Sequence, residues 1–159
     1  MQLLISDANI LIDLEEGELL DVFFQLPYRF SIPDILYYEE LEAQHSHLLG
    51  LGLELGELTA DTMTYASGLI EQARGPSRND CFALALARQE NCPLLTGDRA
   101  LRTLAHNNNV LFMGTIWVVE ELVTREIIDV DRARSAYTRM RNNDRRLPWD
   151  DAFERLDAL

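Results

Sequence analysis

The stretch MQLLISDANILID (residues 1–13) decides the fold, because it places an acidic residue directly after a short apolar run. MQLLIS has the length of a buried strand, and DANILID reads as a turn into a helix that Gly17 interrupts. Asp7 is therefore expected at the carboxyl end of the first strand. In open α/β sheets, ligands bind outside the carboxyl ends of the strands.

Strand and helix patterns alternate from this stretch to residue 114. Further strands are predicted at RFSIP (29–33), LGLGLELGEL (49–58), NCPLLTGD (91–98) and NVLFMG (109–114). Helices are predicted from Asp34 as N-cap, from Thr59 as N-cap, after a capping box formed by Ser77 and Asp80, and over RALRTLAHN (99–107). This alternation predicts a three-layer α/β/α fold whose mostly parallel central sheet has about five strands.

The character of the chain changes after Gly114, where strand patterns stop. TIWVVEELVTREII, DRARSAYTRMRNN and PWDDAFERL read as three helices, with Pro148 suited to the N1 position of the last. We therefore expect residues 1–115 to form the α/β domain. Residues 116–159 are expected to form a helical extension packed on the same domain.

The composition bounds the function classes. At 159 residues and 47% hydrophobic, the chain can bury a sizeable core. No apolar run approaches the roughly 18 to 20 residues that span a bilayer, so a cytoplasmic protein without a membrane partner is expected. The chain contains no lysine, which excludes a P-loop as well as receiver domains and haloacid-dehalogenase phosphatases, since all of these need one.

The charge is distributed unevenly along the chain. The net charge is −13, and it belongs entirely to residues 1–73, since Asp and Glu balance Arg in the second half. Six arginines lie late in the chain and admit three interpretations: contact with an RNA backbone, docking on the acidic first half of this or a neighbouring chain, or solvation. They are Arg132, Arg134, Arg139, Arg141, Arg145 and Arg146.

Four acidic residues stand out because each lies where an apolar run meets a helix or loop. They are Asp7, Glu40, Asp80 and Asp98. Converging carboxylates repel one another unless a cation lies between them, and ligand sets made only of oxygen favour Mg²⁺ or Mn²⁺ over zinc. Each acid alone also fits an ordinary role, as a helix N-terminal acid, a turn residue or part of a solvated face.

Taken in order, these residues and their motifs resemble the PIN-domain family of metal-dependent ribonucleases, which includes VapC-like toxins. The matching strings are Asp7 and Asn9 in DAN, Glu40 before Leu41, Asp80 leading CFALALA, and TGD ending at Asp98. The later strings GDRALRTLA, NVLFMGTIWVVEELV and RRLP are similar to an uncharacterised PIN-like branch with additional carboxyl-terminal helices.

The resemblance implies a Mg²⁺- or Mn²⁺-dependent ribonuclease that hydrolyses RNA phosphodiester bonds, in one form the toxin of a toxin–antitoxin pair. Asp7, Asp80 and Asp98 are the expected metal ligands, and Glu40 the fourth catalytic acid, which binds a second ion or orients the water. The expected partners are RNA, an antitoxin and a second copy of the chain. The alternative is a PIN-like protein without strong catalysis that acts as a binding partner in a complex.

Other polar residues receive supporting predictions. Asn9 and Thr96 are candidates to hydrogen-bond the ligand carboxylates from behind, although a turn role fits equally well. Arg99 and Arg102 follow Asp98 and are candidates for substrate phosphate contacts or for solvation. His45 and His47 are two apart on a predicted helix, so their side chains are expected to point in different directions.

Overall fold

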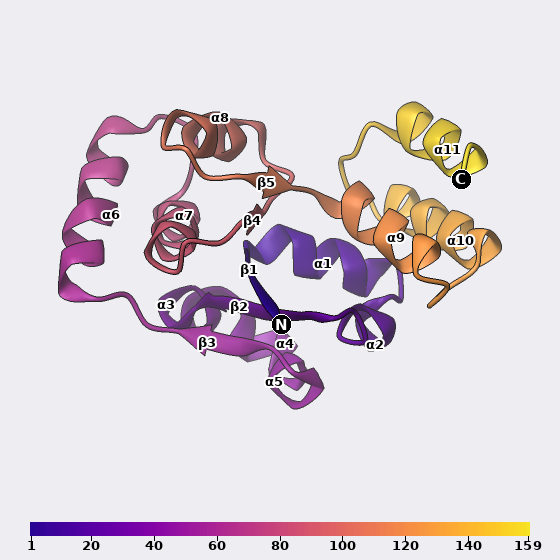
Figure 1. The fold of residues 1–159 in the computed structure, drawn as a ribbon, viewed down its shortest axis with the longest axis horizontal. Coiled ribbons are helices and arrows are strands. Elements are labelled where there is room, and N and C mark those ends of the chain that lie inside the picture. The colour runs from indigo at the N-terminus through magenta and orange to yellow at the C-terminus, as the bar shows by residue number, and fades with distance from the viewer.

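A computed structural model describes all residues, 1–159, as one α/β structure with a five-stranded parallel sheet (Figure 1). The strand order is β3-β2-β1-β4-β5. The strands are β1 Gln2–Ser6, β2 Tyr28–Pro33, β3 Glu54–Gly56, β4 Leu94–Leu95 and β5 Phe112–Met113. The predicted three-layer α/β/α fold is confirmed. No helix is long and apolar enough to cross a membrane.

Helices lie on both sides of the sheet, with α6 and α7 on one side and α1, α9 and α10 on the other (Figure 1). The helices before β3 are α1 Ala8–Glu16, α2 Leu20–Phe23, α3 Asp34–Leu36, the π-helix η1 Tyr37–Leu41, α4 Glu42–His45 and α5 His47–Leu51. Those after β3 are α6 Ala60–Gln72, α7 Arg78–Gln89, α8 Arg99–Asn107, α9 Thr115–Thr124, α10 Val130–Asn142 and α11 Trp149–Asp157.

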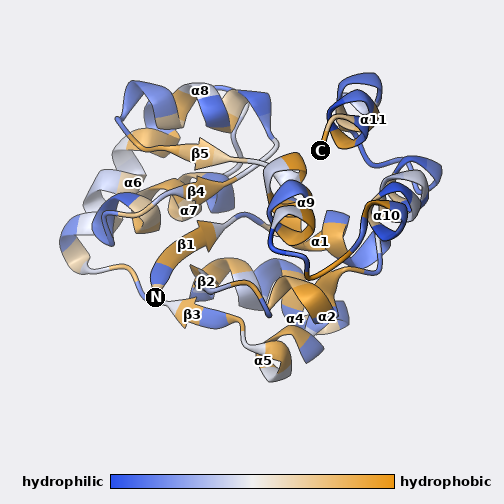
Figure 2. Cartoon of the chain, turned by 45° about the vertical axis from the view of Figure 1, so that its right-hand side comes forward, coloured by the Kyte–Doolittle hydropathy of each residue, from blue (hydrophilic) through white to orange (hydrophobic).

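The core follows directly from the apolar runs of the sequence. Leu4 and Ile5 of β1 are almost completely buried, and so is every residue of the CFALALA segment, Cys81–Ala87 in α7. This helix packs on β1, β2 and β4 and is thereby enclosed by the sheet and α6. Figure 2 shows the apolar residues on the strands and on inward helix faces, whereas α10 is largely hydrophilic.

The carboxyl-terminal helices pack on the α/β part through α1 and α9. Gly17, at the end of α1, permits this approach, because an added Cβ there would lie 2.6 Å from Met140 Cε of α10. Between α10 and α11, the Tyr137 ring meets the Phe153 ring edge to face, with their centroids 5.6 Å apart. Pro148 precedes α11 at the N-cap, one residue earlier than the predicted N1 position.

Two segments differ from the sequence-based predictions. The strand expected over 49–58 was wrong for its first half, because α5 continues to Leu51 and only Glu54–Gly56 pair with β2. Gly52, with φ of 124°, ends that helix in a conformation that favours glycine. The helix expected from Asp34 is divided by the π-turn η1, and Pro33 rather than Asp34 takes the N-cap position.

Candidate active site

The sheet has its switch point between β1 and β4. From β1 the chain passes to β2 on one side, whereas β4 pairs with β1 on the other, with Ser6 opposite Leu95. Connections leave these two strands in opposite directions, which opens a crevice beyond their carboxyl ends, the usual ligand position in such sheets. Asp7 directly follows β1, and Thr96 directly follows β4.

Asp7 is fully buried at this crevice and caps α1. Its Oδ1 accepts the backbone N–H of Ile10 at 3.0 Å, and its Oδ2 accepts the hydroxyl of Thr96 at 2.5 Å. Burial raises the pKa of Asp7 to about 7, although both hydrogen bonds oppose the rise. Asp80 lies near enough for its charge to raise the pKa of Asp7 further.

Thr96 links Asp7 to Asp98. The Thr96 hydroxyl donates to Asp7 and accepts the backbone N–H of Asp98 at 3.1 Å. Asp98 in turn caps α8, with its Oδ1 accepting the N–H of Leu101 at 2.8 Å. Thr96 thus hydrogen-bonds the Asp7 carboxylate and the Asp98 backbone, and its role behind metal ligands stays a prediction.

Asp80 is fixed by the capping box that the sequence predicts. Its Oδ2 accepts the N–H of Ser77 at 3.0 Å, while the Ser77 hydroxyl accepts the N–H of Asp80 at 3.1 Å. Asp80 therefore has both the structural role of a helix N-terminal acid and a position near Asp7. No hydrogen bond within the chain reaches Oδ1 of Asp80 or Oδ2 of Asp98.

Glu40 is exposed on η1 and is connected to the other acids through Asn79. The Asn79 amide donates to Glu40 Oε2 at 2.9 Å and to Glu39 Oε2 at 3.1 Å, and Arg78 forms an ion pair with Glu39. The Asn79 bond and then Arg78 lower the pKa of Glu39 below its ordinary value. Asn79 also holds a buried Oδ1 without a hydrogen-bond partner.

Asn79 is thus a site residue that the sequence analysis did not select. Its only signal in the sequence was its position directly before Asp80. Taken together, the contacts connect Asp98, Thr96 and Asp7, with Asp80 nearby, and connect Asp80 through its neighbour Asn79 to Glu40. No three acidic, histidine or cysteine side chains are placed where they could hold one metal ion together.

The family comparison bears directly on this arrangement. A family model described as a PIN domain matches residues 3–156. The chain belongs to the PIN-domain family. PIN domains are generally nucleases that use divalent metal ions. No curated protein matches the chain. The match extends through the helices after Gly114 and includes all four candidate acids.

The donor chemistry of this PIN domain fits a divalent cation. Two acids are buried on α1, Asp7 and Asp13, and their surroundings differ. Asp13 is paired with Arg145, whose Nε lies 2.6 Å from Oδ1, and it accepts the Thr115 hydroxyl at 2.7 Å. Asp7 has hydrogen bonds from neutral groups only, so a cation is the partner that its buried charge lacks.

Such an ion does not require three protein ligands. Mg²⁺ usually keeps several waters and binds through one or two carboxylates, so a set of three is not required. The free oxygens of Asp80 and Asp98, with the carboxylate of Asp7, supply hard oxygen donors on the same edge of the sheet. Zinc would favour histidine and cysteine, which none of these contacts provides.

Arg102 has contacts that hold it within the fold of the PIN domain. Its Nε donates to the Thr96 carbonyl at 2.9 Å, and its guanidinium carbon lies 5.3 Å from the centre of the Phe112 ring. Arg99, the other candidate for substrate contact, is exposed and has no ion pair within the chain. Substrate contact therefore remains a prediction for both residues, with Arg99 the freer of the two.

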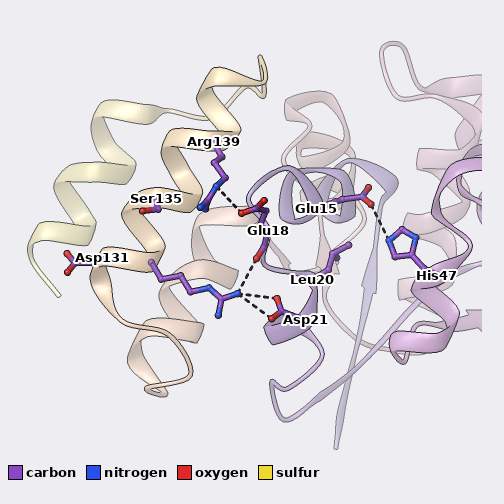
Figure 3. A pocket seen from close by; sticks show the side chains of 9 residues that line it. Glu15, Glu18, Leu20, Asp21, His47, Asp131, Ser135 and Arg139 are labelled. Carbon is purple, nitrogen blue, oxygen red and sulfur yellow. Dashed lines mark hydrogen bonds and ion pairs between the residues drawn. The ribbon is translucent and has the colours of Figure 1, made fainter.

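The late arginines mostly pair with acids of the same chain. A cavity of about 690 Å³ lies between α1, α2 and α10. There Arg139 contacts Glu18 at 3.0 Å (Figure 3), and Arg132 contacts Asp21 at 3.2 Å. With Arg145 on Asp13, the C-terminal helices dock on the acidic first half. Arg134 pairs instead with Asp157, and Arg141 lies over the Phe153 ring.

One prediction about the histidines was wrong. His45 Nδ1 lies 2.6 Å from Glu15 Oε2, and His47 Nε2 lies 3.2 Å from Glu15 Oε1, so both side chains point to the same carboxylate. The predicted divergence assumed one continuous helix. The helix is interrupted at Ser46, which changes the direction of His47 relative to His45.

Proposed function

We propose that this PIN domain is a Mg²⁺- or Mn²⁺-dependent endoribonuclease that hydrolyses phosphodiester bonds of RNA. The observation that carries the proposal is the buried Asp7 carboxylate, which has no cationic partner in the chain and is joined through Thr96 to Asp98. A divalent cation at the switch point would offset the cost of burying this charge. The family supports the same chemistry, since PIN domains are generally nucleases.

Each candidate site residue has a separate role in this proposal. One or two carboxylates among Asp7, Asp98 and Asp80 would hold the ion, with water completing its coordination, and Thr96 joins the Asp7 carboxylate to the Asp98 backbone. A bound divalent cation supplies a water of lowered pKa and neutralises charge that develops on the phosphate. Glu40, held through Oε2 by Asn79, keeps Oε1 free to accept a proton from the attacking water or to contact a second ion.

The proposal is tested by cleavage of a mixed-sequence pool of single-stranded RNA. Wild type should cut the pool with Mg²⁺ or Mn²⁺ and stop when EDTA is added. Asp7→Asn and Asp98→Asn should each reduce the rate strongly, whereas Glu126→Gln, which removes a charge at an exposed turn after α9, should not. Cleavage that survives EDTA or both site variants would overturn the metal mechanism.

Metal binding has its own measurement. A cation that binds only the folded chain raises the free energy of unfolding, by about 2.7 kcal/mol at a concentration 100 times the Kd. The melting temperature rises with it. Mn²⁺ should therefore raise the melting temperature of wild type and leave the Asp7→Asn, Asp98→Asn double variant unchanged. An equal rise in both proteins would place the ion elsewhere.

A second candidate function is that of a binding partner with little catalysis. It is favoured by the positions of the acids, since no three of them can hold one ion together. A melting shift with Mn²⁺ but no cleavage of any RNA would support this candidate over the first. A toxin role, the narrower form of the ribonuclease proposal, predicts that expression arrests growth of a bacterial host and that Asp7→Asn abolishes the arrest.

A further inference from the structure

A cavity of about 680 Å³ adjoins the candidate active site and has a wholly polar lining. Five of its residues, among them Asn9 and Asp98, come from the segments that follow β1 and β4. The C-terminal part of the chain supplies three more, which lie in the turn after α10. The lining is Asn9, Asp13, Gly97, Asp98, Arg99, Asp144, Arg145 and Arg146.

The backbone conformation of the turn after α10 places Arg145 and Arg146 at this cavity. Asp144 has φ of 61°, and the N–H of Arg145 returns to the Met140 carbonyl at 3.0 Å, which ends the helix sharply. Arg145 is then anchored by Asp13 and reaches Asn9 Oδ1 at 3.3 Å. The anchor fixes the position of the next residue, Arg146, at the cavity.

Some charged side chains of the cavity form an ion pair with each other, and others have no partner. Asp13 and Arg145 neutralise each other, which leaves Asp98 and Asp144 against Arg99 and Arg146. Arg99 and Arg146 are exposed, and neither has an ion pair or a side-chain hydrogen bond within the chain. Once a cation neutralises Asp98, these two guanidinium groups give the cavity a positive excess.

Arg146 also lines a second hollow, of about 320 Å³, on the other side of Gly97. The two hollows share Asp13, Gly97 and Arg146, and the second continues to Trp117 and Arg155. The two cavities therefore adjoin each other at Arg146. Adjoining cavities suit an extended chain better than a compact ligand.

We propose that Arg99 and Arg146 bind backbone phosphates of single-stranded RNA next to the bond that is cut, so that the C-terminal segment completes the substrate site. The inference rests on the proposed ribonuclease function, since it names the substrate contacts of the same site. Arginine suits this role because its planar guanidinium can donate two parallel hydrogen bonds to a phosphate. Arg145 is a positioning residue that holds the turn.

The test compares Arg99→Ala, Arg146→Ala and the double variant with wild type and with Arg134→Ala. Arg134 is a matched control, because it has the same charge on α10 but pairs with Asp157 outside the cavity. All variants should keep the wild-type melting temperature, since these arginines are at least partly exposed. Binding of a fluorescent mixed-sequence RNA is measured by anisotropy with Mg²⁺ in the cold, where cleavage is slow, at several salt concentrations.

Each cavity variant should weaken RNA binding about tenfold, as expected for one lost hydrogen bond to a charged group. The slope of log affinity against log salt should fall by about 0.7 for each lost phosphate contact. In cleavage assays the KM should rise while kcat stays near that of wild type, which separates substrate binding from chemistry. Arg134→Ala should match wild type in every measurement.

The outcomes separate this inference from the ribonuclease proposal. If wild type cuts RNA and the cavity variants bind and cut as wild type does, the phosphate contacts are refuted while the ribonuclease stands. If wild type binds RNA without cutting and the variants weaken binding, the contacts are supported and the catalytic proposal fails. If wild type neither binds nor cuts any RNA, both are overturned.

Discussion

Replacing Asp7 with asparagine should make the protein more stable, because the carboxylate is buried without a cation. Asparagine keeps an oxygen for the N–H of Ile10 and remains a good N-cap for α1. Its amide can donate to the Thr96 hydroxyl, which then turns its own proton away. The substitution therefore removes a buried charge and keeps the local hydrogen bonds.

The magnitude follows from the pKa of Asp7, which rises from 3.8 to about 7 on folding. Each tenfold change in acid strength is worth about 1.4 kcal/mol, so ionised Asp7 costs roughly 4 kcal/mol above neutral pH. Below the unfolded pKa both states are protonated and no cost exists. Between these values the unfolded state loses its proton first, so the free energy of unfolding falls as the pH rises.

The assay is urea denaturation of both proteins in EDTA across this pH range. Relative to wild type, Asp7→Asn should gain about 2 kcal/mol at about pH 5 and about 4 kcal/mol at about pH 8. For a domain of this size, 4 kcal/mol corresponds to roughly 8 to 16 °C in melting temperature. The same variant should be inactive on RNA, which would make Asp7 a residue that trades stability for function.

A gain that is the same at both pH values would refute the reasoning, since only an ionisation produces the slope. Asp13→Asn is the matched control on the same helix. Burial raises the pKa of Asp13 as well, but Asp13→Asn leaves the partly buried Arg145 without its carboxylate and should therefore destabilise the protein by about 3 kcal/mol, the opposite sign. If both variants destabilise the protein equally, the lack of a cationic partner does not determine how Asp7 affects stability.

Three further outcomes test the structure more locally. Ser77→Ala should lower the free energy of unfolding by about 1 kcal/mol in urea, because it removes half of the capping box that holds Asp80. Glu126→Gly should raise it by up to about 1 kcal/mol, since Glu126 has φ of 59°, which glycine adopts without strain. Gly114→Ala should lower the RNA cleavage rate and the melting temperature together, because an added Cβ would overlap Arg102 and displace it from Thr96.

The sequence predicted the parts of the site that depend on strand ends. Asp7 and Asp98 follow short apolar runs that predict buried strands, and parallel pairing brings the carboxyl ends of those strands to one edge. Ser77 and Asp80 form a local motif of four residues, which is equally legible without a structure. These features need no knowledge of contacts distant in the chain.

The parts that could not be predicted depend on irregular backbone or on distant pairing. The π-turn at Tyr37–Leu41 inserts an extra residue into a helix, and nothing in its apolar pattern marks the insertion. The interruption of the helix at Ser46 is equally unmarked in the sequence, so the convergence of His45 and His47 on Glu15 was missed. The partner choice of Arg145 is a contact across 132 positions, which charge counts alone cannot assign.

The first half of the chain is strongly acidic, which opposes the approach of RNA, and ion pairs with the C-terminal arginines offset a part of that charge. Arg132, Arg139 and Arg145 neutralise acids of the first half from within the chain. The pairs of Arg132 and Arg139 are exposed and add little stability, so their main effect is on the local electrostatic potential.

The two buried acids at α1 differ in their partners. Asp13 receives an internal cation, whereas Asp7, six positions earlier on the same helix, receives none. Anchored on Asp13, Arg145 leaves Asp7 without a cationic partner in the chain and places Arg146 at the cavity beside Asp98.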